Sequence, residues 1–470
     1  MAESTKRKSN LSLGLRYGYG LGEFGLNFLI TFIAYYLTFF LTNVVGLSMA
    51  VAATVTTATT VIKVFGMPIA GVLIDAIHLK KSRFRHWMVV GGILYFVGGT
   101  LLFWKLSLPP AAYAVLFCVF FFIYWLGYSL AWSSFRALMD PICGDHPMDK
   151  VGLTAAASQE GVIARVIFSF VASAILGLFA GNVAAGYTAV NAVFGLIAVV
   201  CLSIVSLVVK PYDTILEGYT DEEIDAAAAK AKAAKAARPK MSGKDFWNTV
   251  KTRPMLVFLV CVIFRCAVQT IYSTLLVYYL AYVLNAAGLT SVYMMIAYAV
   301  SFIGALLVEP IAKRLGKRAT FVWTTLLSAA VLLLLLVSKS PAWFIGVMAV
   351  FHLLSVIGVT LISPCMADIG EYNAMKNGSQ AKGFTFSIGG MAIQLSSVIG
   401  AAIAAFGMVA VGFDVTAVTA EGILGLQNLY IWGVTIVSVI SALLFFLYPL
   451  TEKKMAELRA EYAEKGYIED

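Results

Sequence analysis

Five charged residues lie deep inside apolar stretches of the sequence, where an unpaired charge is costly. A charge near the centre of a lipid bilayer costs roughly 2.5–3.5 kcal/mol even on lenient insertion scales. We therefore expect each of them to face a cavity or a partner. A carboxylate there can carry a proton, and an arginine or lysine can neutralise an anionic group of a bound molecule. The five are Glu23, Lys63, Glu160, Arg165 and Arg265.

Three of these charges are positive and two are negative, which favours an anionic substrate group such as a carboxylate. Purely structural roles stay open beside this interpretation. Glu23 could pair with a basic loop residue near the cytoplasmic face, Lys63 could join two helices through a carboxylate, and Glu160 could be solvated at the cytoplasmic boundary. Arg265 lies about 16 Å into its segment, too deep to reach water easily.

Polar and aromatic side chains recur around these charges at helical spacing. Tyr124, Tyr128 and Trp132 are four residues apart and follow one face of a helix. Such a stripe more often packs in a core, but hydrogen bonds and aromatic stacking are also how sugars are recognised. Next to buried charges it favours a wet cavity. The residues we expect to hydrogen-bond or stack are Asn27, Tyr128, Trp132, Gln269 and Gln394.

Acidic residues also mark the ends of several apolar segments, close to basic clusters. Gly71-x-x-x-Asp75 comes before a basic cluster, and so does Glu309 in the second half of the chain. An acid at a helix end can pair with basic loop residues and clamp neighbouring helices. The residues for which we expect such a gating or structural role are Asp75, Arg85, Glu309, Asp368 and Glu371.

The elements that must position these residues follow from the composition. The chain has 470 residues, of which 60% are hydrophobic and 13% are charged. Soluble domains are roughly 45–50% apolar and ~25% charged, so this chain cannot cover a soluble surface with polar groups. Inside a bilayer the backbone polar groups must be paired within each segment, which favours helices. The sequence predicts an all-α membrane protein.

Twelve apolar segments are long enough to span a membrane. Lys and Arg gather in the connections that follow the second and eighth segments, while the opposite side holds only Lys105 and Lys339 at its edges. The positive-inside bias therefore places both termini in the cytoplasm, and it accounts for the net charge of +9 without a nucleic-acid partner. The expected segments are about 14–42, 48–76, 87–108, 111–139, 150–180, 184–210, 254–285, 290–312, 319–338, 342–367, 381–410 and 427–449.

The longest polar insertion separates six segments from six. Thr220 begins a capping-box pattern there and an Ala/Lys-rich stretch follows, which predicts a short helix. The two halves carry similar loop signals, as is typical of a transporter built from a repeat. The expected domains are a six-helix bundle over 1–210, a cytoplasmic linker over 211–253, a second six-helix bundle over 254–450 and a cytoplasmic tail over 451–470.

No stretch of the sequence has the spacing of enzyme machinery. The four histidines are spread over loops and one helix, without a metal-ligand spacing. The glycine-rich stretch Gly18-Tyr-Gly20-Leu-Gly22 opens an apolar helix with no strand before it, so it does not predict a nucleotide site. We expect no catalytic residue, no metal and no cofactor other than a coupling cation.

Several motifs resemble one known family. Tyr17-Gly-Tyr-Gly-Leu-Gly-Glu-Phe-Gly25 with Leu41-Thr-Asn-Val-Val-Gly46 looks like the first helix of the glycoside–pentoside–hexuronide:cation symporters, of which melibiose permease is the best-known member. Asp368-Ile-Gly-Glu371-Tyr372 and the Pro68-x-x-Gly71 stretch also look like this family. The similarity runs over the whole chain. It implies a major facilitator fold with 12 transmembrane helices in two six-helix bundles, and alternating access to a central site.

The resemblance also bears on the coupling cation. The melibiose-type cation site uses two acids on helix 2, the second of them just before a proline. Matching on Pro68 places Lys63 and Met67 at these positions, so both acids are gone. An ammonium repels Na⁺, which needs oxygen ligands, so the standard Na⁺ site is not expected. Lys63 either takes the cation's place or binds the substrate anion, and a proton on Glu23 or Glu160 is the coupling cation we expect instead.

The sugar-binding positions of the family are partly changed. The helix 1 acid falls on Asn27 and the helix 4 acid falls near Tyr128. The helix 5 arginine is retained as Arg165, and the helix 11 lysine falls near Gln394. The resemblance therefore implies a related sugar site with an altered charge pattern.

We interpret the chain as a secondary active transporter of the inner membrane that moves an anionic sugar, a hexuronate or uronide. The three buried cations would neutralise the substrate. We expect a monomer whose partners are the sugar and membrane lipids. Two other transport functions stay open: a neutral glycoside or pentoside symporter with purely structural cations, and a lipid or lysophospholipid transporter. A receptor or sensor would need a large folded cytoplasmic domain, for which 211–253 is too short.

Overall fold

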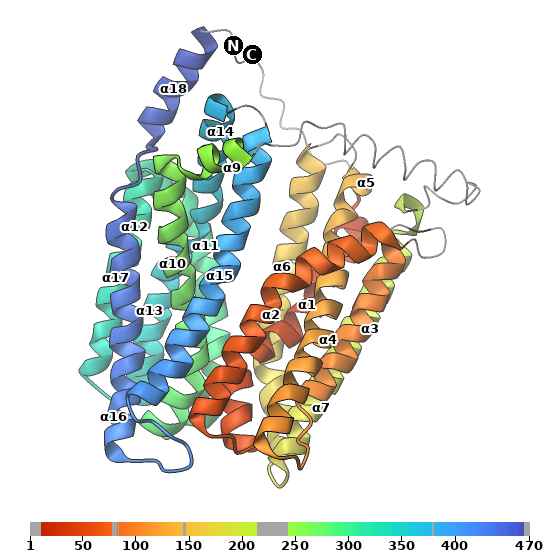
Figure 1. The fold of residues 1–470 in the computed structure, drawn as a ribbon, viewed down its shortest axis with the longest axis vertical. Coiled ribbons are helices and arrows are strands. Elements are labelled where there is room, and N and C mark those ends of the chain that lie inside the picture. Colours follow the sequence, from red (N-terminus) through yellow and green to blue (C-terminus); the bar gives the residue numbers. More distant parts are fainter. Residues whose placement is uncertain are drawn as a thin grey trace. The chain divides into compact units, whose positions relative to one another are not determined.

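The computed structural model describes residues 11–77, 82, 84–143, 147–213, 243–377 and 380–464. These residues are almost entirely helical (Figure 1). The chain divides into two compact units, Met1–Ala231 and Lys232–Asp470. The helix expected in the linker after Thr220 lies outside the described residues.

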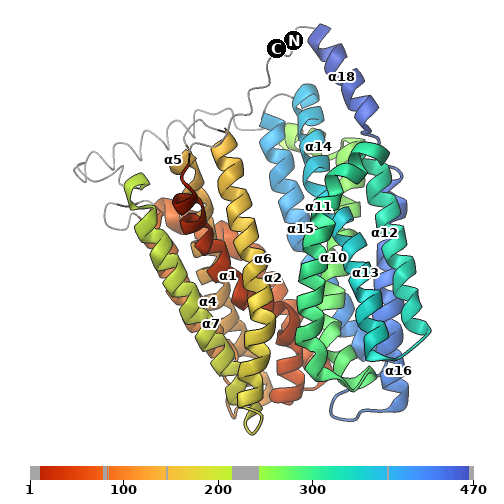
Figure 2. The same ribbon diagram turned by 180° about the vertical axis from the view of Figure 1, so that it is seen from behind.

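The first unit is a bundle of long helices. α1 packs against α6 and α7 (Figure 2). α3 lies along α4 and α7, and α2 lies on α4 (Figure 1). The helices are α1 (Leu13–Phe39), continued by a π-helical turn (Phe40–Val44), α2 (Met49–Ala76), α3 (Arg85–Leu102), α4 (Pro110–Ala137), α5 (Met139–Cys143), α6 (Pro147–Leu178) and α7 (Val183–Val208), followed by a 3-10 turn (Lys210–Tyr212).

The second unit is a bundle of the same kind. α10 packs against α15 and α17, α12 packs against α13 and α17, and α11 packs against α13. The helices are α9 (Gly243–Val250), α10 (Arg253–Tyr278) with a π-helical turn (Tyr279–Val283), a 3-10 turn (Ala287–Leu289), α11 (Thr290–Leu315), α12 (Lys317–Leu333) with a 3-10 turn (Leu334–Leu336), α13 (Pro341–Thr360), α14 (Ile362–Asn377), α15 (Gln380–Ala410), α16 (Ala420–Asn428) with a π-helical turn (Leu429–Gly433), α17 (Val434–Phe445) and α18 (Glu452–Glu464).

The first long helix of each unit ends in the same way. α1 and α10 each run into a π-helical turn and then reach a residue with positive φ, Gly46 at 86° and Asn285 at 50°. A left-handed residue turns the chain sharply, and glycine and asparagine are the residues that adopt this conformation most readily. The shared ending is a structural sign of the repeat that the loop signals indicated.

A carboxylate caps α3 in the first unit and α12 in the second. Asp213 Oδ2 accepts hydrogen bonds from the Arg85 N–H (2.8 Å) and from the Ser82 hydroxyl (2.7 Å). Glu452 Oε1 accepts one from the N–H of Lys317, the first residue of α12, at 2.6 Å. Both acids follow the last long helix of their unit and tie its end to the start of another helix. A negative charge at a helix N-terminus also interacts favourably with the helix dipole.

We expect Asp213→Ala to lower the free energy of unfolding by about 1 kcal/mol, because the start of α3 loses its acceptor. Thermal unfolding of the purified protein in detergent should show a lower midpoint. Asp213→Asn keeps an acceptor oxygen and should retain most of the stability. An unchanged midpoint in Asp213→Ala would mean that the capping bonds contribute nothing.

Eleven helices within the described residues are long and apolar enough to cross a membrane. The sequence predicted twelve. The segment expected at 87–108 forms α3, which ends at Leu102 and has only 18 residues, with Arg85 and His86 among them. These two polar residues lower the mean hydropathy of α3, and α3 is the expected span that is missing from the eleven. The count of twelve therefore stays a prediction.

The last expected segment, 427–449, begins earlier than predicted. It starts with α16 at Ala420, because the Thr419 hydroxyl accepts a hydrogen bond from the Gly422 N–H at 3.0 Å and caps the helix. The sequence did not predict this start, because α16 contains polar residues and the segments were located by their apolar stretches.

Candidate functional site

One face of α4 carries five large side chains, which we call the α4 stripe. Phe121, Trp125, Tyr128, Trp132 and Arg136 are three or four residues apart and so share this face. The ring centroids of Phe121 and Trp125 are 6.4 Å apart, and those of Trp125 and Tyr128 are 4.9 Å apart. The Arg136 guanidinium lies 5.3 Å from the Trp132 ring centroid. The stripe is therefore aromatic along most of its length and cationic at one end.

Lys63 of α2 lies at the opposite end of the stripe. Its Nζ is 5.2 Å from the Trp125 ring centroid and 5.7 Å from that of Phe121. The Trp125 Nε1–H donates a hydrogen bond to the Lys63 carbonyl oxygen at 2.9 Å. In the part of the chain that the structure describes, no carboxylate forms an ion pair with Lys63. Aromatic faces hold this charge, a contact worth about 0.5–2 kcal/mol.

A close approach of α2 to α4 makes this contact possible. A Cβ atom on Gly66 would lie 2.7 Å from Trp125 Nε1 and 2.8 Å from Ser129 Oγ, which is too close for any other residue. Because Gly66 follows Lys63 by three residues, both lie on the same side of α2. The glycine therefore lets the lysine reach the aromatic rings.

Glu23 of α1 forms an ion pair with Arg136 at the cationic end of the stripe. Glu23 Oε2 lies 3.0 Å from the Arg136 guanidinium, and the two side chains are 20% and 30% exposed. Asn27 Nδ2 donates to the Glu23 carbonyl oxygen at 2.7 Å and lies 3.4 Å from its Oε1. The partner of Glu23 is therefore a residue of α4 and not the loop residue considered from the sequence.

The sequence interpretation missed Arg136. It lies close to the end of the segment expected at 111–139, where arginine is common because its side chain can reach water. The signal that could have found it is its position four residues after Trp132, on the same helix face.

Glu160 of α6 lies against α1. A Cβ atom on Gly20 would be 2.9 Å from the Glu160 carboxyl carbon, so the two helices touch there. Glu160 is 8% exposed, and its Oε2 has no hydrogen-bond partner among the described residues. A Cβ atom on the neighbouring Gly161 would lie 3.0 Å from Asn27 Nδ2 and 3.1 Å from Glu23 Cγ. The structure thus places Glu160, Asn27 and Glu23 along one helix contact.

Tyr128 joins the two ends of the α4 stripe. Its ring stacks on Trp125, and Trp132 follows it by four residues on the same helix face. Arg165 lies on α6 and is half-buried. The first unit therefore brings most of its predicted site residues to the contacts among α1, α2, α4 and α6.

In the second unit, Arg265 is 2% exposed. Its Nη2 donates hydrogen bonds to the Ser355 carbonyl oxygen (2.5 Å) and hydroxyl (2.8 Å), which connect α10 to α13. Gln269 of α10 is exposed and Gln394 of α15 is half-buried. In the described contacts no hydrogen bond joins Arg265 to either glutamine, so a shared role of these three residues stays a prediction.

Two acids of α14 form ion pairs with other helices. Asp368 lies 2.5 Å from Lys317 Nζ of α12. Glu371 accepts two hydrogen bonds from Arg459 of α18, at 2.6 and 2.7 Å. These bonds raise the pKa of the Arg459 guanidinium above its ordinary value. α14 is thus clamped to α12 and to α18, as the sequence predicted for acids at helix ends.

The other predicted gating residues differ. Glu309 pairs at 2.6 Å with Lys313, four residues later on its own helix, and both side chains are exposed. Glu309 thus pairs with the basic cluster that follows it, but this ion pair joins no second helix among the described residues, and its gating role stays a prediction. Arg85 takes part through its backbone N–H, which donates to Asp213. The side chain of Asp75 lies outside the described residues.

The chemistry available in the first unit is that of binding. The α4 stripe offers aromatic faces for stacking, a phenol for hydrogen bonding and, at Lys63, a cation without an acid partner among the described residues. Within the described ranges no three His, Cys, Asp or Glu side chains gather as metal ligands would.

Comparisons with known proteins agree on one class. Residues 18–452 match the family described as "MFS/sugar transport protein". The isoprimeverose transporter of Lactiplantibacillus pentosus is 24% identical over 469 residues, which cover 97% of this chain and 93% of that protein. The glucuronide carrier protein homolog of Escherichia coli (strain K12) is 24% identical over 474 residues, 96% of each chain. Among solved structures, the nucleoside transporter NupG has a TM-score of 0.66 at 12% identity, covers 93% of this chain and 100% of its own, and shows a shared fold.

Proposed function

The chain belongs to the MFS/sugar transport protein family, and we propose that it imports an anionic sugar, a hexuronate or uronide, across the inner membrane by alternating access. The family and the relatives are transporters, so the chain is a multi-pass membrane transporter of the sugar symporter type and not an enzyme. The resemblance to the glycoside–pentoside–hexuronide:cation symporters and the expected major facilitator fold are both confirmed.

Lys63 carries the proposal for an anionic substrate. Its ammonium rests on Trp125 and Phe121, and no described carboxylate neutralises it. A substrate carboxylate that reached Lys63 would form an ion pair in surroundings where water screens the attraction weakly. Glu23 and Arg136 already neutralise each other and offer no such unpaired charge.

The sugar ring would use the other members of the α4 stripe. Tyr128 and Trp132 are half-buried, so parts of both rings are open for stacking and the Tyr128 hydroxyl can hydrogen-bond. A substrate with its carboxylate at Lys63 and its ring on this face would be oriented at two points. Direct contacts from Asn27 and Arg165 stay part of this proposal.

In the second unit, Gln269 and Gln394 remain proposed substrate contacts. Arg265 is better suited to a structural role than to substrate binding, because its guanidinium already donates two hydrogen bonds to Ser355. We therefore assign Arg265 to holding α10 against α13.

Proton coupling through Glu160 accompanies this proposal. Burying a charged oxygen without a hydrogen-bond partner is unfavourable, and taking up a proton removes the charge. Glu160 has such an oxygen, whereas Glu23 is paired with Arg136. Na⁺ is disfavoured because Lys63 stands where the resemblance to melibiose-type symporters implies an acid. We also propose a monomer with both termini in the cytoplasm, from the Lys and Arg distribution in the sequence.

Uptake of labelled glucuronate into proteoliposomes tests the function and the coupling. We expect an acidic exterior to stimulate uptake several-fold and an inward Na⁺ gradient to have no effect. Glu160→Gln should remove the stimulation by pH, because it cannot exchange a proton. Glu309→Gln, which changes an exposed acid, is the matched control and should respond like the unmodified protein. Uptake driven by Na⁺ and indifferent to pH would overturn the coupling proposal.

A neutral glycoside or pentoside is the second candidate substrate, favoured by the relative named for isoprimeverose. In that case the contact between Lys63 and Trp125 would only hold α2 on α4. Lys63→Ala would then spare sugar binding and change stability alone.

A further inference from the structure

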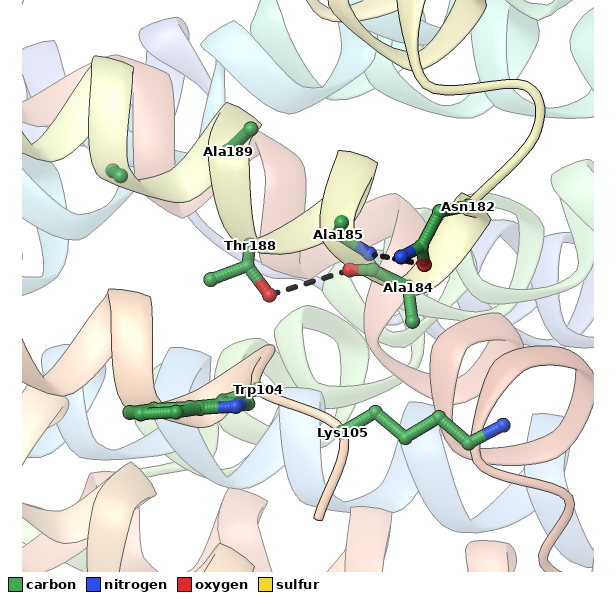
Figure 3. Close-up of a pocket in the computed structure, with 8 residues that line it drawn as sticks. Trp104, Lys105, Asn182, Ala184, Ala185, Thr188 and Ala189 are labelled. Atoms are coloured by element: carbon green, nitrogen blue, oxygen red, sulfur yellow. Dashed lines mark hydrogen bonds between the residues drawn. The ribbon is translucent and has the colours of Figure 1, made fainter.

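A groove of about 560 Å³ lies in the first unit, at the opposite end of α3 from Asp213. One wall is the connection between α3 and α4, and the other is the first turns of α7 (Figure 3). The groove is lined by Trp104, Lys105, Asn182, Ala184, Ala185, Thr188, Ala189 and Ala192.

Two hydrogen bonds fix the walls of the groove. The Thr188 hydroxyl donates to the Phe103 carbonyl oxygen at 2.8 Å, which ties the connection to α7. Trp104 and Lys105 follow directly and face α7 across the groove, the indole lying flat along it (Figure 3). The Asn182 side chain accepts a hydrogen bond at 3.2 Å from the backbone N–H of the third residue of α7 and so caps that helix.

The lining of the groove is mostly apolar and includes one cation, Lys105. Four alanines of α7 form one wall, and the exposed side chains Val193, Leu196 and Val200 continue this apolar surface along the same helix. Lys105 has no ion pair within the described ranges, and no acid lines the groove. Trp104 is 52% exposed. Tryptophan and lysine side by side are typical of the boundary between lipid and water.

We propose that this groove binds an anionic phospholipid. The headgroup phosphate would lie at Lys105, beside the N-terminal turn of α7, where backbone N–H groups and the helix dipole favour negative charge. One acyl chain would lie along the alanine wall, with the Trp104 ring over its first carbons. α3 ends and α4 and α7 begin at this level, which is where the headgroup region of a bilayer would meet the protein. A soluble sugar acid would leave the apolar wall unused, so the shape favours a lipid.

Native mass spectrometry of the full-length protein tests this site. The protein would be titrated with phosphatidylglycerol and with phosphatidylcholine carrying the same acyl chains. We expect Lys105→Ala to weaken the tightest phosphatidylglycerol site about fivefold, the effect of one lysine near an anionic headgroup, and to leave phosphatidylcholine binding unchanged. Trp104→Ala should weaken both lipids, because it removes the contact with the acyl chain.

Lys339→Ala is the matched control, because Lys339 is an exposed lysine in the connection between α12 and α13 of the second unit. It should leave lipid binding unchanged. Equal phosphatidylglycerol affinity in Lys105→Ala and the unmodified protein would overturn the proposal, and so would an equal loss in Lys339→Ala. Displacement of phosphatidylglycerol by soluble glucuronate would assign the groove to a soluble anion instead. None of these outcomes depends on which sugar the protein carries.

Discussion

Lys63→Gln should weaken glucuronate binding by about 30-fold or more. Removing one partner of a desolvated charge pair costs about 2–5 kcal/mol, and each 1.4 kcal/mol is about tenfold in affinity. Binding of a neutral methyl glucoside should change little, because no charge on that ligand meets Lys63. Isothermal titration of the purified protein with both ligands measures the ratio of the two affinities. A purely structural role of Lys63 would not alter this ratio.

Two further variants separate charge from packing. Lys63→Arg keeps the positive charge and should retain measurable glucuronate binding. Trp125→Phe removes the Nε1–H donor to the Lys63 carbonyl oxygen and weakens the aromatic contact, so it should lower stability and cause a smaller loss of affinity. If Lys63→Gln binds glucuronate and the neutral glucoside with unchanged affinities, Lys63 does not meet the substrate.

Breaking the pair between Glu23 and Arg136 is the second large effect we expect. Arg136→Gln leaves a partly buried carboxylate without its partner, and Glu23→Gln leaves an unpaired guanidinium. Each variant should lower the unfolding midpoint and reduce uptake about tenfold or more, because α1 and α4 lose their charged contact. The double variant should be less damaged than the sum of the two, with a coupling of about 1–2 kcal/mol in a double-mutant cycle.

A double-mutant cycle on the exposed pair between Glu309 and Lys313 is the matched control for the cycle at Glu23 and Arg136. Both of its side chains are about three-quarters exposed, so water screens the attraction and the coupling should be close to zero. If the effects at Glu23 and Arg136 are additive, as expected for the exposed pair, the partly buried contact does not link the helices.

The sequence predicted the helices well because their signal is local. A long apolar run must be helical in a bilayer, and such runs located α1, α2, α4, α6 and α7 within a few residues. The helix boundaries were predicted less exactly where polar residues belong to a helix. α3 carries Arg85 and His86 in its first turn, and α16 begins at Ala420 through a cap by Thr419 that an apolar search ignores.

The site was predicted only in part, because helix spacing gives the faces of a helix but not its neighbours. The sequence placed Tyr124 in a stripe with Tyr128, yet Tyr124 is buried against Tyr95 of α3 with ring centroids 4.8 Å apart. The residue that meets Lys63 is Trp125, one position further on. That contact depends on how closely α2 approaches α4 at Gly66, which a single sequence does not reveal.

Whether the substrate is charged is tested most directly by competition for uptake. Proteoliposomes would take up labelled glucuronate in the presence of unlabelled galacturonate or of neutral methyl galactosides. We expect the uronate to inhibit uptake strongly and the neutral galactosides to inhibit it far more weakly, because only the uronate carries a charge that Lys63 can pair with. Competition by the neutral galactosides, with none from uronates, would contradict the assignment of Lys63 to an anionic sugar.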